Sequence, residues 1–255
     1  MIVAGIVATV AAYAAGVVRA YRVGHPIGVA PLVAFALAIA ALAGALLGPM
    51  DDLSDRSLSW HMVQHMALID IVAPLFVLAA PVRLLLAALP ARPASRVARA
   101  FAAAPLRRLF HPAFAWLQLA AVLYGVHFSP LYEASLENEN VHAAEHLLFL
   151  ASGVVFWTPL LGVAPAPHAP SYPVRLLAIF LALPMSAFLG FAFYVARTPI
   201  YPHYAALPGA LADQMNAGAV MWIAGGGPLL VALLWIVAAW GERERRFGAV
   251  FDGQS

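Results

Sequence analysis

A chain of 255 residues with 64% hydrophobic and only 10% charged residues has too little charge for a water-facing surface, because soluble domains carry about 25% charged residues. The 14 basic residues, all arginine, and the 12 acidic residues give a formal net charge of +2. The sequence has no cysteine, which excludes a structural disulfide and a thiolate metal site.

Apolar stretches long enough to cross a hydrocarbon core of roughly 30 Å recur along the whole chain. We therefore predict an all-α membrane protein, with residues 1–255 forming a single domain, a bundle of seven transmembrane helices. Proline and glycine within these stretches are compatible with the prediction, because neighbouring helices in a membrane satisfy the freed backbone groups. The predicted spans are 2–20, 28–48, 58–80, 112–130, 141–163, 174–196 and 214–240.

The arginines predict the orientation of this bundle. Arg56 and Arg197 fall in loops on one side of the predicted membrane, and the other 12 of the 14 arginines fall on the opposite side. The positive-inside rule places the arginine-rich side in the cytoplasm, so the N-terminus is expected outside and the C-terminus inside. Topology and contact with the lipid bilayer explain the arginines, and no nucleic acid partner is expected.

The longest predicted loop, residues 82–111, contains the basic run ARPASRVARAFAAAPLRRLF. Its pattern predicts a short amphipathic helix on the inner membrane surface. The arginines there serve topology and contact with anionic lipids, or alternatively form a docking surface for a partner.

Six of the nine histidines lie at the external ends of predicted spans or in an external loop: His61, His65, His127, His142, His146 and His203. His61 and His65 are four residues apart, as are His142 and His146, so each pair occupies one helix face within about one turn. A single pair of this kind is weak evidence for a site. Two pairs inside apolar spans, both at the external side, predict one shared metal centre of the kind that helical bundles build from facing helices.

His127, at the end of the fourth span, and Asp213, near the start of the seventh, fall at the same predicted depth. We expect them to be additional ligands or supporting groups. Imidazole suits copper, zinc, iron and nickel, and thioether ligands tilt the preference toward Cu(I), so copper is the first choice and zinc the second. Whether Met62, Met66 or Met215 contributes a sulfur ligand stays open, because methionine is also a common apolar filler.

Two acidic residues fall inside predicted spans, where ionisable groups are costly and usually functional. Glu145 lies beside the second histidine pair. Asp70 lies about 18 Å along the third span from Leu58, at a rise of 1.5 Å per residue. We expect each carboxyl group to face the bundle interior and to have a polar partner or a ligand.

Three segments of the chain resemble a known family. The runs HMVQHMALIDIVAPLFVLAAP, VHAAEHLLFLASGVVFWTPLLG and DQMNAGAVMW are similar to the signature segments of CtaG, the seven-helix assembly factor of caa-type cytochrome c oxidase. The resemblance implies a multi-pass protein of the bacterial inner membrane that aids copper delivery or insertion, with an oxidase subunit or a copper chaperone as partner. The family positions it implies here are His61, Gln64, His65, His127, His142, Glu145, His146, Asp213 and Gln214.

Two other functions compete with a non-enzymatic assembly factor. The run from His142 to His146 matches the H-x-x-E-H pattern of inverted zincins, so an intramembrane zinc metalloenzyme with Glu145 as general base is the main alternative. The match rests on three positions, two of which any such histidine pair supplies. A haem protein with paired axial histidines is the third possibility.

The arginine distribution predicts the result of a topology experiment. A periplasm-active reporter fused after Ser135 should be active, and the same reporter fused after Ser95 should be inactive. The reverse pattern would contradict the orientation and the external placement of the six histidines.

Overall fold

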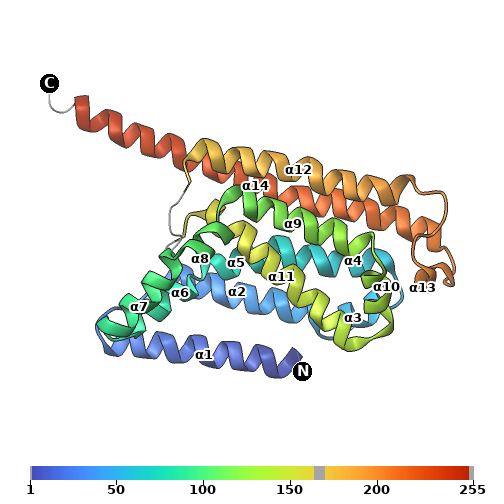
Figure 1. Cartoon of the computed structure of the whole chain (residues 1–255), viewed down its shortest axis with the longest axis horizontal. Coiled ribbons are helices and arrows are strands. Elements are labelled where there is room, and N and C mark those ends of the chain that lie inside the picture. Colours follow the sequence, from blue (N-terminus) through green and yellow to red (C-terminus); the bar gives the residue numbers. More distant parts are fainter. Residues whose placement is uncertain (1, 164–169, 253–255) are drawn as a thin grey trace.

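The computed structural model describes residues 2–163 and 170–252, and the regular elements of these residues are all helices. Figure 1 shows them as a bundle of roughly parallel long helices with short helices at its two ends. In chain order the elements are α1 (Ile2–Arg22), α2 (Val29–Leu46), α3 (Pro49–Ser54), α4 (Leu58–Ala67), the π-helix η1 (Leu68–Val72), α5 (Ala73–Leu78), α6 (Pro81–Ala88), α7 (Ala91–Ala102), α8 (Ala104–Leu109), α9 (Pro112–His127), α10 (Pro130–Glu137), α11 (Glu139–Leu161), α12 (Tyr172–Val195), α13 (Pro202–Ala205) and α14 (Ala210–Asp252).

The predicted membrane bundle is confirmed. Within the described residues, six helical segments are long and apolar enough to cross a membrane, and a bent pair brings the number to seven. The bent pair is α9 and α10, which meet at 65° after His127. The fourth span is thus shorter than the predicted 112–130, because the chain turns at Phe128 and Ser129 and α10 begins at Pro130.

The third span is less regular than predicted, because a π-helical turn separates α4 from α5. The backbone N–H of Ala73 bonds the carbonyl oxygen of Leu68, five residues back. Pro74 follows directly, and a proline within a helix lacks an N–H and crowds the carbonyl group four residues earlier, which here belongs to Asp70. The wider turn relieves that clash and turns Asp70 away from its regular helical position.

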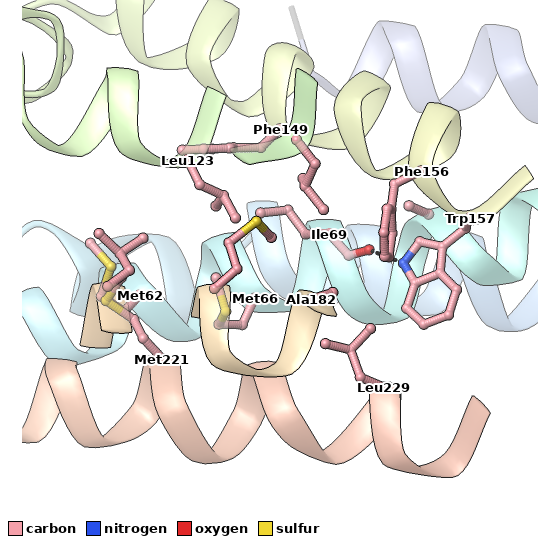
Figure 2. Packing of buried hydrophobic residues seen from close by; sticks show 14 of the residues in the cluster. Met62, Met66, Ile69, Leu123, Phe149, Phe156, Trp157, Ala182, Met221 and Leu229 are labelled. Carbon is pink, nitrogen blue, oxygen red and sulfur yellow. Dashed lines mark hydrogen bonds between the residues drawn. The ribbon is translucent and has the colours of Figure 1, made fainter. Parts of the chain in front are cut away.

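The core lies where α4, η1 and α5 pack between α11 on one side and the α12–α14 pair on the other. Figure 2 shows Met62 and Met66 on this central span, with Met221 and Leu229 of α14 facing them. Trp157 of α11 donates its indole N–H to the carbonyl oxygen of Ile69 at 2.9 Å. This hydrogen bond satisfies a backbone oxygen in the π-helical turn.

The two ends of the bundle differ in chemistry. The basic segment α6–α8 lies at one end, together with the start of α12 and the end of α14, while α3, α10 and α13 lie at the other (Figure 1). The predicted surface helix forms as α7, and its residues are all at least partly exposed. The predicted histidine pairs begin α4 and α11 at the end opposite to the basic segment α6–α8.

Two glycines allow α12 and α14 to approach closely. A Cβ atom on Gly190 would collide with the carbonyl oxygen of Gly218, and a Cβ atom on Gly218 would collide with that of Gly190. Backbones this close pack tightly by van der Waals contact, the main force between helices in lipid.

This contact predicts a stability difference between two glycine substitutions in α14. Gly218→Ala should lower the free energy of unfolding by about 1–3 kcal/mol, the usual range for overpacking. Gly227→Ala is the matched control, because a Cβ atom there meets nothing within 4 Å. Thermal unfolding of the purified variants in mild detergent measures both, and equal midpoints would contradict the proposed role of the contact.

Candidate metal centre

Four histidines from two helices converge near the N-terminal ends of α4 and α11. His61 and His65 of α4 and His142 and His146 of α11 each offer one ring nitrogen, and these four atoms all lie within 4.8 Å of one another. The rings are correspondingly close, with centroids 4.4 Å apart for His61 and His65, and 4.2 Å apart for His142 and His146. Across the helices the centroids of His61 and His142 are 4.9 Å apart.

The four histidine rings differ in how deeply they are buried. His61, His65 and His146 are buried, whereas His142 is half-buried near the start of α11. A metal ion arriving from outside the bundle at this end would therefore meet His142 first. The three deeper imidazoles lie among apolar side chains, where Phe149 packs 4.5 Å from the ring of His65.

The hydrogen bonds of Tyr204 determine which nitrogen of His61 is free for a metal. The Tyr204 hydroxyl donates its single proton to the carbonyl oxygen of Ser54 at 2.8 Å, and the same oxygen lies 2.9 Å from His61 Nδ1. It must accept from Nδ1–H, because its only proton is already used. His61 Nε2 then carries a lone pair directed at His65 Nε2, 3.0 Å away.

The remaining ring nitrogens fit a bound cation. The Nε2 atoms of His142 and His146 and the Nδ1 atom of His65 are buried and have no hydrogen-bond partner among the described residues. Buried polar atoms are otherwise almost always paired. Several imidazole lone pairs converging within 4.8 Å are the donor set that copper and zinc accept.

Glu145 and His127 border the four histidines. Glu145 Oε2 lies 3.9 Å from His65 Nε2, which is too long for a hydrogen bond but close enough to favour a positive charge at the centre. His127 Nδ1 donates to the carbonyl oxygen of Leu123 at 2.7 Å, so its Nε2 carries the lone pair. The ring centroids of His127 and His65 are 6.0 Å apart, so His127 lies beside the cluster without belonging to it.

Asp213 lies outside the cluster and holds the helix that carries the first histidine pair. Its carboxylate accepts hydrogen bonds from the backbone N–H of Leu58 at 2.6 Å and from the hydroxyl group of Ser59, also at 2.6 Å. The Ser57 hydroxyl donates to the same carboxylate at 2.9 Å. Asp213 thus caps the N-terminus of α4 from the neighbouring helix α14, which satisfies free N–H groups at that end.

Comparison with known protein families identifies the family of this chain. Residues 11–243 match the family model described as the cytochrome c oxidase caa3 assembly factor, Caa3_CtaG. The chain belongs to this family. The resemblance seen in the three sequence segments is thereby confirmed.

The chain is also similar to mycobacterial proteins. It is 28% identical over 262 residues to the uncharacterized proteins Mb0105 of Mycobacterium bovis and MT0111 of Mycobacterium tuberculosis, a match that covers 98% of this chain and 40% of each relative. The uncharacterized protein ML1998 of Mycobacterium leprae is 27% identical over 247 residues, covering 92% of this chain and 38% of that protein. The chain thus spans about two fifths of the length of these relatives. No solved structure matches it significantly.

The two glutamines implied by the CtaG resemblance hold backbone segments around the centre. Gln64 is buried and donates to the carbonyl oxygen of Ala45 at 2.8 Å, which ties α4 to α2. Gln214 accepts from the backbone N–H of Ile200 at 2.7 Å and donates to the carbonyl oxygen of Thr198 at 3.2 Å. Both side chains therefore fix the helices and the external loop that surround the four histidines.

Three tyrosines near the cluster were absent from the sequence prediction. The ring of Tyr132 lies 5.4 Å from that of His61 and stacks on Tyr201 at 4.1 Å. Burial raises the pKa of Tyr201 and Tyr204 above the ordinary range, so both remain neutral hydrogen-bonding phenols at physiological pH. Tyr201 donates to the carbonyl oxygen of His127 at 2.9 Å. No sequence motif marked these residues. Tyr132 lies in α10, and Tyr201 and Tyr204 lie at the start of α13, about 140 residues from His61 along the chain.

The role of Tyr204 predicts a change in metal affinity. Tyr204→Phe removes the acceptor that fixes the tautomer of His61, and losing such a partner typically weakens metal binding about 10–100-fold. Tyr194→Phe, on an exposed tyrosine of α12, is the matched control and should bind metal as the unmodified protein does. Competition titration with a metal-chelating dye measures both, and equal affinities would contradict the proposed role of Tyr204.

Proposed function

We propose that this chain is a copper-binding assembly factor for cytochrome c oxidase, one seven-helix domain in the bacterial cell inner membrane. Its N-terminus lies outside, its C-terminus lies in the cytoplasm, and the histidine cluster faces the periplasm. The observation that carries the proposal is the convergence of His61, His65, His142 and His146 in a member of an oxidase assembly family. The arginine-rich elements at the opposite end of the bundle support the orientation.

Copper is the cargo in this proposal. The half-buried His142 accepts an ion from the external side, and the three buried histidines complete its coordination away from bulk water. Tyr204 and the capping carboxylate of Asp213 hold α4 and its imidazoles in position. Neutral nitrogen ligands bind copper less permanently than thiolates do, which suits a site that must release its ion.

The recipient in this proposal is a cytochrome c oxidase subunit, and the donor is a periplasmic copper chaperone. Family membership supports an interaction with components of the oxidase. Copper is favoured over zinc because oxidase assembly requires copper insertion, whereas the four imidazoles by themselves suit either metal.

The intramembrane zinc metalloenzyme is the second candidate. Glu145 lies next to the cluster, as the H-x-x-E-H pattern requires, with Oε2 3.9 Å from His65 Nε2. A catalytic zinc site, however, has three protein ligands and keeps its fourth position open for water. Four converging histidines could supply a fourth protein ligand and fill that position, which favours binding and transfer over hydrolysis.

Replacing one histidine from each helix tests the proposed site. His65→Ala and His146→Ala should each lose most of the bound copper, because each removes one of four converging ligands. His111→Ala, at the arginine-rich end, is the matched control and should keep full occupancy. Elemental analysis of protein purified in mild detergent, with and without added copper, gives the stoichiometry. If both single variants fold and keep their full copper content, the proposed site is wrong.

The same samples separate the site from the delivery function and from the competing functions. If the two variants lose copper but cells expressing them mature their oxidase normally, the site stands and copper delivery is wrong. One tightly bound zinc retained after exposure to copper would favour the metalloenzyme. A Soret band in the absorbance spectrum would favour a haem protein.

A further inference from the structure

Asp70 is an acidic residue within the third span that has no polar partner among the described residues. It lies in η1, and 8% of its surface is exposed. Across the described ranges 2–163 and 170–252, its carboxyl group has no hydrogen bond and no ion pair, so the partner expected from the sequence is not within these residues. A carboxyl group without a partner in hydrocarbon is costly, and a side chain this well buried cannot reach the membrane surface.

The carboxyl group lies on a groove between α5, α11 and α14. The groove has a volume of about 510 Å³, and apart from Asp70 its walls are apolar or aromatic, including Trp157, Pro228 and Trp235. Asp70 lies within the π-helical turn, and Pro74, four residues later, also lines this groove. On its inner side Asp70 borders a separate cavity of about 20 Å³, which has room for one water molecule at most and none for a side chain.

The groove opens on the lipid-facing side of the bundle. Val231 in its wall is 68% exposed, and Ile71 and Trp235 are also exposed. It extends along the third span from Asp70 to Leu78, eight residues or about 12 Å of helix. Two turns of a helix fit that length, and the occupant must come from within the membrane.

The chemistry of the groove selects among possible occupants. A lipid acyl chain fills an apolar groove but offers no hydrogen bond to a carboxyl group. A transmembrane helix can supply both apolar contact and one polar side chain at the depth of Asp70, and such pairs are the usual means by which ionisable groups are satisfied within membranes.

We propose that this groove is the docking site for a transmembrane helix of a partner protein, which presents a hydrogen-bond donor to Asp70 near the membrane centre. The donor is an arginine, lysine, histidine, asparagine or glutamine side chain. Its flanking residues are apolar and pack against Ile71, Val231 and Trp235. The groove is separate from the metal centre, because none of the four histidines lines it and Asp70 lies five residues, more than one helical turn, beyond His65.

Site-directed crosslinking tests this proposal, and the absence of cysteine from the chain makes single cysteines unambiguous. In native membranes, the thiol group of the Val231→Cys variant is labelled with a membrane-permeant maleimide photocrosslinker. The matched control is Ile223→Cys, also on α14, which is 74% exposed and outside the groove. Only the Val231 position should give an adduct whose crosslinked peptide is a transmembrane segment with a donor side chain.

Substitutions of Asp70 in this chain and of the donor residue in the partner helix complete the test. Asp70→Leu should reduce the adduct about 3- to 30-fold, the range expected for one interhelical hydrogen bond in a membrane. Replacing the partner's donor with leucine should reduce it equally. Asp70→Asn, which still forms hydrogen bonds, should retain more of the adduct. Unchanged copper stoichiometry in Asp70→Leu shows that the variant is folded.

Four results would overturn the proposal: adducts with lipid alone, adducts with a second copy of this chain alone, the same adducts from both cysteine positions, or an adduct that Asp70→Leu leaves unchanged.

Discussion

Polar groups inside a hydrocarbon layer must find partners, and this requirement shapes the bundle from its outer end to its centre. Imidazole and carboxyl groups placed in transmembrane helices cost free energy unless hydrogen bonds, opposite charges or a ligand compensate. At the outer end the compensation is partly internal, since Tyr204 pairs with His61 and Asp213 caps α4. The two proposals concern groups without such a partner among the described residues. At one site these are ring nitrogens of three histidines and the neighbouring Glu145 carboxylate, and at the other the carboxyl group of Asp70.

The helices around the histidines are held by a layer of polar contacts that is nearly independent of the metal. Gln64 ties α4 to α2, Gln214 fixes the external loop, and Asp213 ties α4 to α14. These contacts are hydrogen bonds to backbone groups, which position whole helices and loops, not single rings. In the proposed function, an ion could therefore be exchanged at the histidines without the surrounding helices losing their arrangement.

Much of the architecture was accessible from the sequence because membrane constraints are strong. The length of the apolar stretches predicts the transmembrane spans. The four-residue spacing of the histidines predicts the two pairs that the structure brings together. The sequence could not reveal Tyr204, because its contact with His61 depends on how an external loop folds over the bundle. It also could not reveal the π-helical turn at Leu68–Val72, and a regular helix would have placed Asp70 differently. The helix cap formed by Asp213 depends on the packing of α14 against α4, which spacing along the chain does not determine.

The central claim is that imidazoles from two helices bind one copper ion, and X-ray absorption at the copper edge of the purified, copper-loaded protein tests it most directly. The account predicts one ion per chain with a first coordination sphere of three or four nitrogen atoms at about 2.0 Å, and the multiple-scattering pattern of imidazole rings. A first sphere dominated by sulfur at about 2.3 Å, or one without imidazole scattering, would contradict it.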